Sequence, residues 1–493
     1  MDIKDFRDKL DAIDDKMAAL FKERLAVVRE IGLWKKSCGS PTSHGDREKA
    51  ILARLLPRFD EGLKGYAEDL YREIFRSSKE YQRGLLGIYY VVGKSLKHTW
   101  SPDIYVPLGL DYRVKEFTSE SELSKFVSKR EYSGFNVTIP YKKAVMEMLD
   151  EISEEARKIG AVNTVVNRNG KLYGYNTDIG GMRYALAAAG IEVKGKVAAV
   201  LGSGGTAMTA EYLLRTGGAR EIVKVSRRGP VDYVNVYERK DIEVIVNTTP
   251  VGMFPAAEAT PIDVSKFPAL EGVFDAIYNP LRTALVSSAM AEGIAASGGL
   301  PMLVEQGRLA YNLYKDTETD IPVTENLTKQ IELKKSNIVL CGMPSSGKST
   351  IGKLLAKVLG REFYDADEMI EKAAGMSIPD MFERFGEGYF RKKEAEAIAS
   401  LSALNGAVIA TGGGAVMSEA NRVRLKRNGI AVLIERDNAA LVADGRPVSR
   451  REGIEALYDK RMPVYREFAD LSVSNDASPR DAAESIVRRL FSE

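Results

Sequence analysis

Two short polar segments in the middle of the chain carry residue types that could move a proton. Residues 135–142 form a β-branched strand pattern that Pro140 stops, because proline lacks the backbone donor of a strand. This delivers Lys142 at the mouth of a turn, and residues 174–178 repeat the design and end in Asp178. A lysine and an aspartate at two strand ends could pass a proton to a carbonyl that receives hydride. The alternative for an arbitrary pair of this kind is a surface salt bridge.

The residues around this pair resemble one enzyme family. Asn-Val-Thr-Ile-Pro-Tyr-Lys at 136–142, Gly-Ala-Val-Asn-Thr at 160–164 and Asn-Thr-Asp at 176–178 are similar to shikimate dehydrogenases, and the likeness covers residues 84–315. The resemblance implies that NADPH reduces 3-dehydroshikimate, with Lys142 and Asp178 at the carbonyl. It implies further substrate contacts at Thr99, Ser101, Thr138, Asn163, Tyr278 and Gln306. Thr99 replaces a family serine and Ile179 a family glycine, and quinate stays open as an alternative substrate.

A glycine-rich turn follows the apolar strand pattern at 196–201. Its Gly-x-Gly-x-x-Ala spacing opens a helical pattern at 208–214, which lets a pyrophosphate approach a helix N-terminus. The next strand, 221–225, ends in two arginines instead of the carboxylate of an NAD site, which favours the 2′-phosphate of NADP. An exposed basic turn is the alternative. We expect NADP to contact Gly202, Gly204, Gly205, Ala207, Ser226, Arg227 and Arg228.

The last third of the chain carries a phosphate-binding motif. An apolar strand at 337–341 leads into Gly-Met-Pro-Ser-Ser-Gly-Lys-Ser at 342–349, which matches Gly-x4-Gly-Lys-Ser and precedes a helical pattern. Backbone N–H groups of such a loop hold the phosphates of ATP, while the lysine reaches the β- and γ-oxygens and the serine reaches Mg²⁺. The expected nucleotide contacts are Gly342, Gly347, Lys348, Ser349 and Thr350.

The phosphate acceptor follows only from a second resemblance. Residues 337–493 resemble shikimate kinases through Asp365-Ala-Asp367, Phe382, Gly386-Glu387, Phe390-Arg391, the glycines at 412–414, Gly445-Arg446-Pro447 and Arg461-Met-Pro463. The resemblance implies phosphorylation of shikimate, with Asp365 near Mg²⁺ beside Ser349 and Asp367 on the attacking hydroxyl. It places Arg391, Gly413, Gly414 and Arg461 on the substrate and Arg446 on the transferring phosphate. For any one of these arginines, solvent exposure is the alternative.

The first 83 residues show a helical heptad seam. Its members step by three and four: Phe6, Leu10, Ile13, Met17, Leu20, Arg24, Val27, Ile31 and Trp34. A helix of about 45 Å, at 1.5 Å per residue, must bury such a seam, and we expect a second chain to cover it. Residues 46–62 and 66–83 predict two more helices. Arg24 and Lys35 lie about 20° apart around the helix and could face one pocket, although Arg24 could instead snorkel.

This segment resembles the all-helical chorismate mutases at Arg7, Glu23-Arg24, Ile31-Gly32, Lys35, Asp46-Arg47-Glu48 and Gln82. The resemblance implies rearrangement of chorismate to prephenate in an interlocked dimer. Arg24 and Arg47 would hold carboxylates, and Arg7 would enter from the other subunit. Lys35 and Gln82 would bind the ether oxygen, and Glu48 a ring hydroxyl. His44 and Gly45 depart from the family pattern, so a module that only dimerises or regulates is the alternative, as is a scaffold with one decayed activity.

Composition is that of an ordinary soluble protein of several domains. The 493 residues are 44% hydrophobic and 28% charged, and a net charge of +2 gives no bulk attraction to nucleic acid or membrane. Two cysteines and no apolar signal region predict a cytoplasmic protein. The resemblances imply small-molecule substrates, and the seam of the first helix together with the mutase resemblance implies a homodimer.

The expected architecture has three modules. We expect an all-α mutase module at 1–83, an α/β two-domain dehydrogenase at 84–315, a linker at 316–336 and an α/β P-loop kinase with a parallel sheet at 337–493. Within the dehydrogenase, the substrate part would take about 84–190 and 300–315, and a Rossmann-type NADP part about 191–299.

Overall fold

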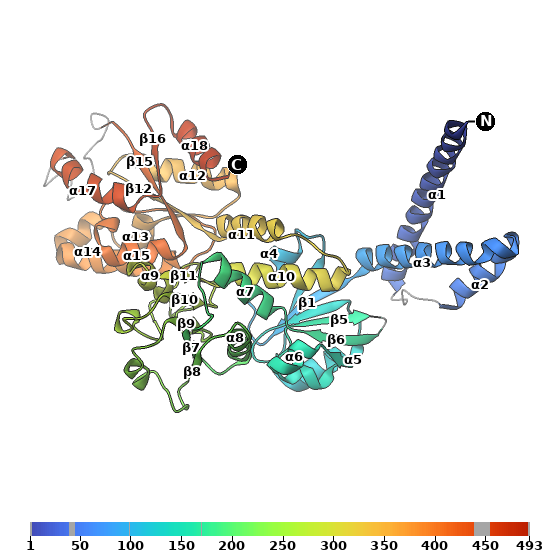
Figure 1. Cartoon of the computed structure of the whole chain (residues 1–493). Helices are drawn as coiled ribbons and strands as arrows, with labels where there is room; N and C mark the ends of the chain where they lie inside the picture. The colour runs from blue at the N-terminus through green and yellow to red at the C-terminus, as the bar shows by residue number, and fades with distance from the viewer. Residues whose placement is uncertain (1, 39–44, 98, 169, 438–453, 492–493) are drawn as a thin grey trace. The chain divides into compact units, whose positions relative to one another are not determined.

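The computed structural model describes residues 2–38, 45–97, 99–168, 170–437 and 454–491, with helix backbone alone at 33, 35–38, 45–46, 79–80, 82–86 and 454 (Figure 1). The chain forms two compact units, which are described separately. The first comprises Met1–Ile179 with Gln306–Asp320, and the second comprises Gly180–Glu305 with Ile321–Glu493.

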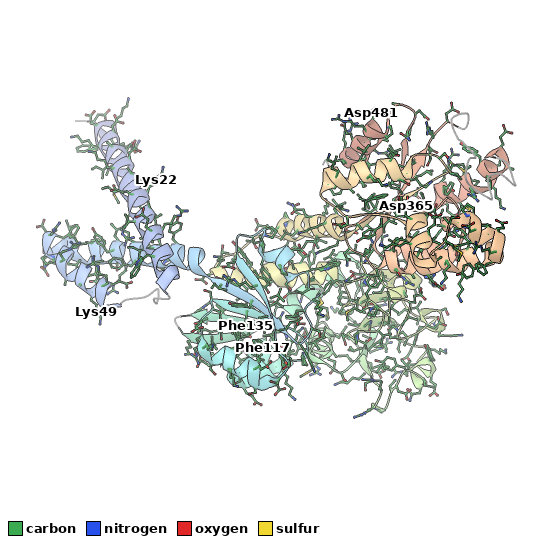
Figure 2. All side chains as sticks on the ribbon, turned by 180° about the vertical axis from the view of Figure 1, so that it is seen from behind. Lys22, Lys49, Phe117, Phe135, Asp365 and Asp481 are labelled. Atoms are coloured by element: carbon green, nitrogen blue, oxygen red, sulfur yellow. The ribbon has the colours of Figure 1, made fainter. Side chains whose placement is uncertain are left out.

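The first unit begins with three helices: α1 (Ile3–Cys38), α2 (Gly45–Leu55) and α3 (Lys64–Leu86). The single long helix predicted from the seam is confirmed by α1, which packs against α3. The predicted helix at 46–62 is shorter, because Pro57 stands at the start of a 3-10 turn and a second such turn precedes α3. Figure 2 shows Lys22 and Lys49 projecting from α1 and α2.

A six-stranded mixed sheet forms the rest of the first unit. Its order is β2 (Asp111–Glu116), β1 (Ile88–Gly93), β3 (Gly134–Val137), β5 (Thr164–Arg168), β6 (Lys171–Tyr175) and β4 (Glu151–Ile152). Strand β5 runs antiparallel to both neighbours, and the other pairs are parallel. The dehydrogenase region was expected to begin at residue 84, but its first strand starts only at Ile88, because α3 continues to Leu86.

Short helices accompany this sheet: α4 (Ser101–Tyr105), α5 (Glu120–Lys129), the 3-10 helix η3 (Ala144–Met148) and α6 (Glu154–Ile159). Side chains from α5, α6, η3 and the strands form one buried cluster. Phe117 and Phe135, which Figure 2 labels, belong to it. The first two residues of α7 (Asp178–Ala188) and the part of α10 (Leu300–Lys315) from Gln306 onward also belong to this unit.

The second unit contains two five-stranded parallel sheets. The first has the order β11 (Ala295–Ser297), β10 (Gly272–Asp275), β9 (Val244–Asn247), β7 (Val197–Leu201) and β8 (Glu221–Val225). Helices α8 (Gly205–Thr216) and α9 (Ala284–Ala291) accompany it. All five residues of β7 are buried, as expected for a strand covered on both faces. The predicted strand–turn–helix at 196–214 is therefore confirmed.

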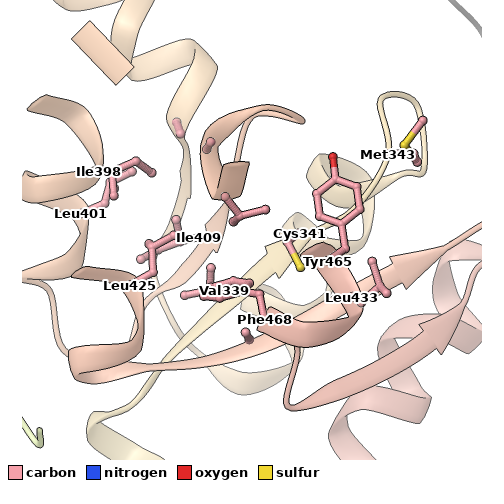
Figure 3. Packing of buried hydrophobic residues seen from close by; sticks show 14 of the residues in the cluster. Val339, Cys341, Met343, Ile398, Leu401, Ile409, Leu425, Leu433, Tyr465 and Phe468 are labelled. Atoms are coloured by element: carbon pink, nitrogen blue, oxygen red, sulfur yellow. The ribbon is translucent and has the colours of Figure 1, made fainter. Parts of the chain in front are cut away.

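The second parallel sheet has the order β13 (Phe363–Asp365), β14 (Val408–Ala410), β12 (Asn337–Cys341), β15 (Gly429–Glu435) and β16 (Leu471–Ser474). Its helices are α12 (Lys348–Leu359), α13 (Ala366–Ala374), α14 (Ile378–Ser402), α15 (Glu419–Asn428), α17 (Ile454–Phe468) and α18 (Pro479–Phe491). Figure 3 shows Cys341 within the apolar cluster of this sheet, beside the α17 side chain of Tyr465. Burial raises the pKa of Cys341 to about 12, so it is a core residue, as expected.

The segment predicted as a linker is mostly helical. Helix α11 (Ile321–Lys335) buries Thr324, Leu327 and Ile331, which recur at helical spacing within a polar sequence. In the described residues, no helix has both the length and the hydropathy needed to cross a bilayer.

Candidate active sites

The two residues that opened the sequence analysis form an ion pair in the first unit. Strand β3 ends at Val137 and the chain turns to Lys142, while Asp178 opens α7. The Lys142 Nζ and Asp178 Oδ2 atoms are 2.5 Å apart, and the side chains are 11% and 8% exposed. A surface salt bridge would leave both groups in water, so this alternative is excluded for the pair.

Asn163 links the ion pair to α10, which lies far along the sequence. Its Nδ2 donates to Asp178 Oδ1 at 2.8 Å, so the two carboxylate oxygens serve different donors. The same nitrogen lies 3.2 Å from Gln306 Oε1 on α10 and 3.0 Å from Thr177 Oγ1. The structure thus brings together four predicted residues, Lys142, Asn163, Asp178 and Gln306, and the adjacent Thr177.

A second layer of polar side chains lies behind Asn163, and the sequence analysis did not assign it. Asn136 Nδ2 donates to Thr164 Oγ1 at 3.1 Å, and Asn136 Oδ1 accepts from Tyr112 at 2.7 Å and Tyr314 at 3.0 Å. All four are buried or nearly so. The available signal was the occurrence of Asn136 inside an otherwise apolar strand.

The two hydroxyls predicted to hold a carboxylate lie together at the start of α4. Thr99 Oγ1 donates to Ser101 Oγ at 3.1 Å. Thr138 follows β3, and a Cβ at Gly93 would lie 2.6 Å from its Cγ2 atom. Glycine at position 93 therefore leaves the space that Thr138 occupies.

The glycine-rich turn of the second unit has the features of a pyrophosphate site. Gly202 has a φ of +117°, and a Cβ there would lie 2.6 Å from Thr248 Oγ1. The space beside Gly204 is open, and α8 begins at Gly205 with the small, buried Ala207 inside it. A phosphate could approach these N–H groups, so the residues fit NADP.

The turn after β8 is basic, as expected for a 2′-phosphate. Ser226 holds the turn through its N–H, which donates to Val231 O at 3.0 Å. Arg227 and Arg228 are exposed, and in the described part of the chain neither guanidinium has a hydrogen-bond or ion-pair partner. Both are available to an anion.

Tyr278 follows β10 in this second unit. The turn that carries it is held by Asp275, which accepts from Thr283 Oγ1 at 2.7 Å and from Asn247 Nδ2 at 3.0 Å. Burial raises the pKa of Asp275 to about 6. The role of Tyr278 in substrate binding stays a prediction.

The P-loop lies between β12 and α12 as predicted. Gly342 and Gly347 have φ values of +140° and +97°, which favour glycine. Lys348 Nζ donates to the carbonyls of Gly342 at 3.0 Å and Met343 at 2.9 Å. Thr350 is exposed on the first turn of α12. The lysine is thus held inside the loop that would surround a phosphate.

Two oxygen ligands for Mg²⁺ lie together beside this loop. Ser349 Oγ donates to Asp365 Oδ2 at 2.6 Å, and Asp365 caps α13. In the described ranges no group of three or more His, Cys, Asp and Glu could hold a metal. Mg²⁺ commonly uses one or two protein oxygens together with nucleotide phosphates, so this pair fits it.

The predicted acceptor residues converge near the glycines at 412–414. Arg391 NH1 lies 2.8 Å from Glu394 Oε2, and its NH2 lies 3.1 Å from Glu387 Oε1. A Cβ at Gly412 would lie 2.6 Å from Asp367 Oδ1 and 3.2 Å from Glu394 Oε1. The sequence analysis missed Glu394, which is buried and whose pKa is raised by that burial, against the opposing charge of Arg391.

The second predicted arginine lies on the other side of these glycines. Arg461 NH1 donates to Gly413 O at 3.1 Å, and Tyr465 donates to the same carbonyl. A side chain at Gly414 would overlap the Arg391 guanidinium. Glycine therefore lets the backbone approach both arginines, while Arg446 lies outside the described residues.

In the helical region, Arg24 has a specific partner. Its NH1 donates to Ser78 Oγ of α3, and its Cζ lies 6.0 Å from the Phe75 ring centroid. Burial lowers the pKa of Arg24, while Tyr71 acts in the opposite direction. Tyr71, Phe75 and Ser78 recur at helical spacing, which was the signal for this face.

The other predicted mutase residues are not brought to Arg24 by any described contact. Arg7 is exposed on α1, Arg47 is exposed on α2, and Glu48 is half-buried. The side chains of Lys35 and Gln82, and residue His44, lie outside the described residues.

Comparisons with known proteins match all three regions. Chorismate mutase type II matches residues 6–83, the shikimate dehydrogenase substrate-binding domain 91–165, and shikimate kinase 344–491. The NADP(+) shikimate dehydrogenase of Caldicellulosiruptor bescii is 38% identical over 256 residues, 46% of this chain and 88% of that protein. The Clostridium beijerinckii enzyme is 35% identical over 258 residues, 48% and 96%.

A solved fusion of chorismate mutase and shikimate 5-dehydrogenase from Clostridium acetobutylicum is 32% identical and covers 50% of this chain and 97% of its own, with a TM-score of 0.47. This chain thus covers nearly the whole length of each of these relatives, and each relative accounts for about half of this chain. The chain therefore belongs to the shikimate dehydrogenase family, and it carries a chorismate mutase domain before that region and a shikimate kinase domain after it.

Proposed function

We propose that the three modules carry out three defined reactions: reduction of 3-dehydroshikimate by NADPH, phosphorylation of shikimate by ATP, and rearrangement of chorismate to prephenate. The observation that carries the proposal is the buried ion pair of Lys142 and Asp178, 2.5 Å apart and joined to Asn163. A closed network of this kind is suited to one small polyhydroxylated ring.

In the dehydrogenase, Lys142 donates a proton to the carbonyl oxygen that becomes a hydroxyl, and Asp178 holds the ammonium in place. NADPH, when bound at the glycine-rich turn, supplies the hydride. Asn163 and Gln306 hold ring hydroxyls, and Thr99, Ser101 and Thr138 bind the carboxylate side. Tyr278 completes the substrate contacts in this proposal.

In the kinase, Asp367 accepts the proton of the attacking hydroxyl, and Arg391 and Arg461 hold the shikimate carboxylate. Lys348 leaves the loop carbonyls for the phosphate oxygens of ATP. Ser349 and Asp365 hold Mg²⁺, which neutralises charge on the phosphates when it is bound. Arg446 touches the transferring phosphate, and Gly413 and Gly414 let the backbone approach the ring.

In the mutase, Arg24 and Arg47 hold the two carboxylates of chorismate, and Lys35 and Gln82 stabilise the ether oxygen as its bond breaks. Glu48 takes the ring hydroxyl. The reaction needs only a fixed conformer and preorganised donors. Arg7 is too far along α1 from Arg24 to serve the same pocket, which supports an interlocked homodimer in which it serves the partner.

The same proposal sets the organisation of the chain. The dehydrogenase forms shikimate and the kinase consumes it, so two consecutive steps share one polypeptide. We place the module boundaries near 83, 315 and 336. The chorismate mutase match ends at residue 83, α10 ends at Lys315 and α11 ends at Lys335, which supports these bounds. Two cysteines, one of them buried and free, favour a cytoplasmic location.

One variant per site, made in the full chain, tests the assignment. Lys142→Met should lower shikimate oxidation by about 10²- to 10⁴-fold, the usual contribution of a positioned acid or base. Lys348→Met should abolish ATP-dependent phosphorylation of shikimate, and Arg24→Ala should abolish chorismate turnover. Each variant should keep the other two activities, which shows that the rest of the chain is still folded. Full activity at the altered site would refute the assignment for that module.

A module that only dimerises or regulates would give a different result. Wild-type chain would then show no chorismate turnover, while shikimate oxidation and phosphorylation would proceed. The match of residues 6–83 to chorismate mutase type II and the partly buried Arg24 weigh against this alternative.

A further inference from the structure

Tyr105 carries a buried hydroxyl to which the proposed mechanism gives no role. Tyr105 is the last residue of α4 and is fully buried. Its hydroxyl has no hydrogen-bond partner in the described part of the chain. Buried donors are nearly always hydrogen-bonded, because an unsatisfied one destabilises the fold, so the retention of this hydroxyl needs a reason.

The position of this hydroxyl is set by close packing on α10. A Cβ at Gly307 would lie 2.9 Å from Ile104 Cγ2 and 3.6 Å from the Tyr105 hydroxyl oxygen. Glycine therefore lets α4 approach the backbone right beside Gln306. The Tyr105 ring is stacked on Tyr112 at a centroid distance of 4.2 Å and an interplanar angle of 22°, which fixes its direction.

The electrostatic surroundings of the hydroxyl agree with this placement. Burial raises the pKa of Tyr105; the amides of Asn136 and Gln306 lower it, and the charge of Asp178 raises it further. The hydroxyl thus lies beside the substrate network and stays protonated, so it can act only as a neutral donor or acceptor.

Asn163 has more acceptors than it can serve. Its Nδ2 atom carries two hydrogens, yet Asp178 Oδ1, Thr177 Oγ1 and Gln306 Oε1 lie 2.8, 3.0 and 3.2 Å from it. Gln306 is the most distant of the three. A ring hydroxyl of the substrate that binds Asn163 would therefore displace Gln306 first.

We propose that Tyr105 is a positioning residue for the dehydrogenase substrate: its hydroxyl donates to the Gln306 side chain once a substrate hydroxyl has taken the place of Gln306 on Asn163. The unpaired donor of the ligand-free site is then satisfied in the complex, and Gln306 is held against the ring. This inference rests on the proposed dehydrogenase function.

The test compares Tyr105→Phe with the wild-type full chain in shikimate oxidation by NADP⁺. The KM for shikimate should rise about five- to tenfold, the range for one net hydrogen bond. The kcat and the KM for NADP⁺ should stay within twofold. The melting temperature without ligand should stay equal or rise, because the variant removes an unpaired buried hydroxyl, and the melting shift on adding shikimate should shrink.

Tyr132→Phe is the matched control. Its buried hydroxyl donates to Val127 O at 2.8 Å and lies in the apolar cluster of the same sheet. This variant should lower the melting temperature and leave the KM for shikimate unchanged, the opposite of the Tyr105→Phe result.

A double variant shows whether Tyr105 acts through Gln306. Tyr105→Phe should have no further effect on the KM for shikimate in a Gln306→Ala background. An unchanged KM in Tyr105→Phe, or full additivity in the double variant, would overturn the inference. Failure of the wild-type chain to oxidise shikimate would instead refute the proposed function, so the two failures are distinguishable.

Discussion

At the scale of single residues, the ion pair with Glu394 orients the Arg391 guanidinium in the kinase site. Its Oε2 atom lies 2.8 Å from Arg391 NH1, and it is buried, whereas Glu387 on the other side of the guanidinium is partly exposed. Glu394→Gln should raise the KM for shikimate about three- to tenfold, because a charge-assisted hydrogen bond becomes a neutral one. The KM for ATP should stay unchanged in steady-state assays.

Glu387→Gln is the control for this prediction. A partly exposed ion pair contributes little, so its KM for shikimate should change less than twofold. Equal effects from the two variants would show that burial of Glu394 is irrelevant to the orientation of Arg391.

Asp275 gives a pH-dependent prediction. Burial raises its pKa to about 6, above the ordinary 3.8. The folded chain therefore binds this proton more tightly than the unfolded chain between pH about 4 and 6, so the free energy of unfolding falls as pH rises through that range. Two pKa units correspond to at most about 3 kcal/mol.

Asp275→Asn removes this titration and keeps an acceptor oxygen for the turn. The melting temperature of the variant, relative to wild type, should therefore increase from pH 4.5 to pH 7.5 in calorimetry of the full chain. A difference that stays constant across this range would contradict the raised pKa.

The residue scale also shows what sequence could not provide. Lys142, Asn163 and Asp178 were predictable because each stands in a local sequence motif. Glu394 and Asn136 were missed because their role depends on partners distant in sequence, such as Tyr314 for Asn136. A local pattern does not contain such contacts.

At the scale of elements, the kink within α14 depends on one glycine, Gly386. Gly386 has a φ of +78° and a ψ of 173°, and it breaks the helix five residues before Arg391. A Cβ there would meet no atom within 4 Å, so the cost of Gly386→Ala is backbone strain alone, about 1–3 kcal/mol. The kinase should melt at a lower temperature, with a higher KM for shikimate.

Gly388, two residues later, is the matched control. It lies in the helical part of α14, and a Cβ there would also meet no atom within 4 Å. Gly388→Ala should raise stability by up to about 1 kcal/mol, since alanine is the better helix former. Similar destabilisation by both substitutions would mean that space, not φ, limits this segment.

Element boundaries were the less predictable part of the fold. Helix α3 was expected to end at residue 83 but continues to Leu86, because the sequence pattern gave no sign of where the helix ends. Residues 316–336 were expected to be a linker on composition, yet α11 buries Leu327 and Ile331. Only three of the fifteen residues of α11 are buried, so its composition is as polar as that of a linker and does not reveal the helix.

At the scale of the whole molecule, the apolar seam of α1 lies exposed on the single chain. Leu10, Ile13 and Leu20 are exposed, the last at 65%, and the seam continues to Trp34. A contiguous apolar stripe of this length marks an interaction surface, and the alternation by three and four fits a helix from a second copy. A dimer would also let Arg7 reach the partner's Arg24 pocket.

The double substitution Ile13→Asp and Leu20→Asp tests this arrangement. Two charges on the seam should convert a wild-type dimer of 54.3 kDa chains into a monomer in sedimentation, because burying an unpaired carboxylate is costly. Chorismate turnover should be lost with the dimer, since Arg7 then has no partner pocket to enter. Shikimate oxidation and phosphorylation should stay within twofold, because their residues lie in other modules.

Val358→Asp controls for the introduction of a charge at an exposed apolar position. Val358 is 63% exposed on α12, far along the chain from the seam. This variant should remain a dimer and retain all three activities. A seam variant that is monomeric and still converts chorismate at the wild-type rate would show that each mutase pocket is complete within one chain, and the exposed seam would then have to serve assembly alone.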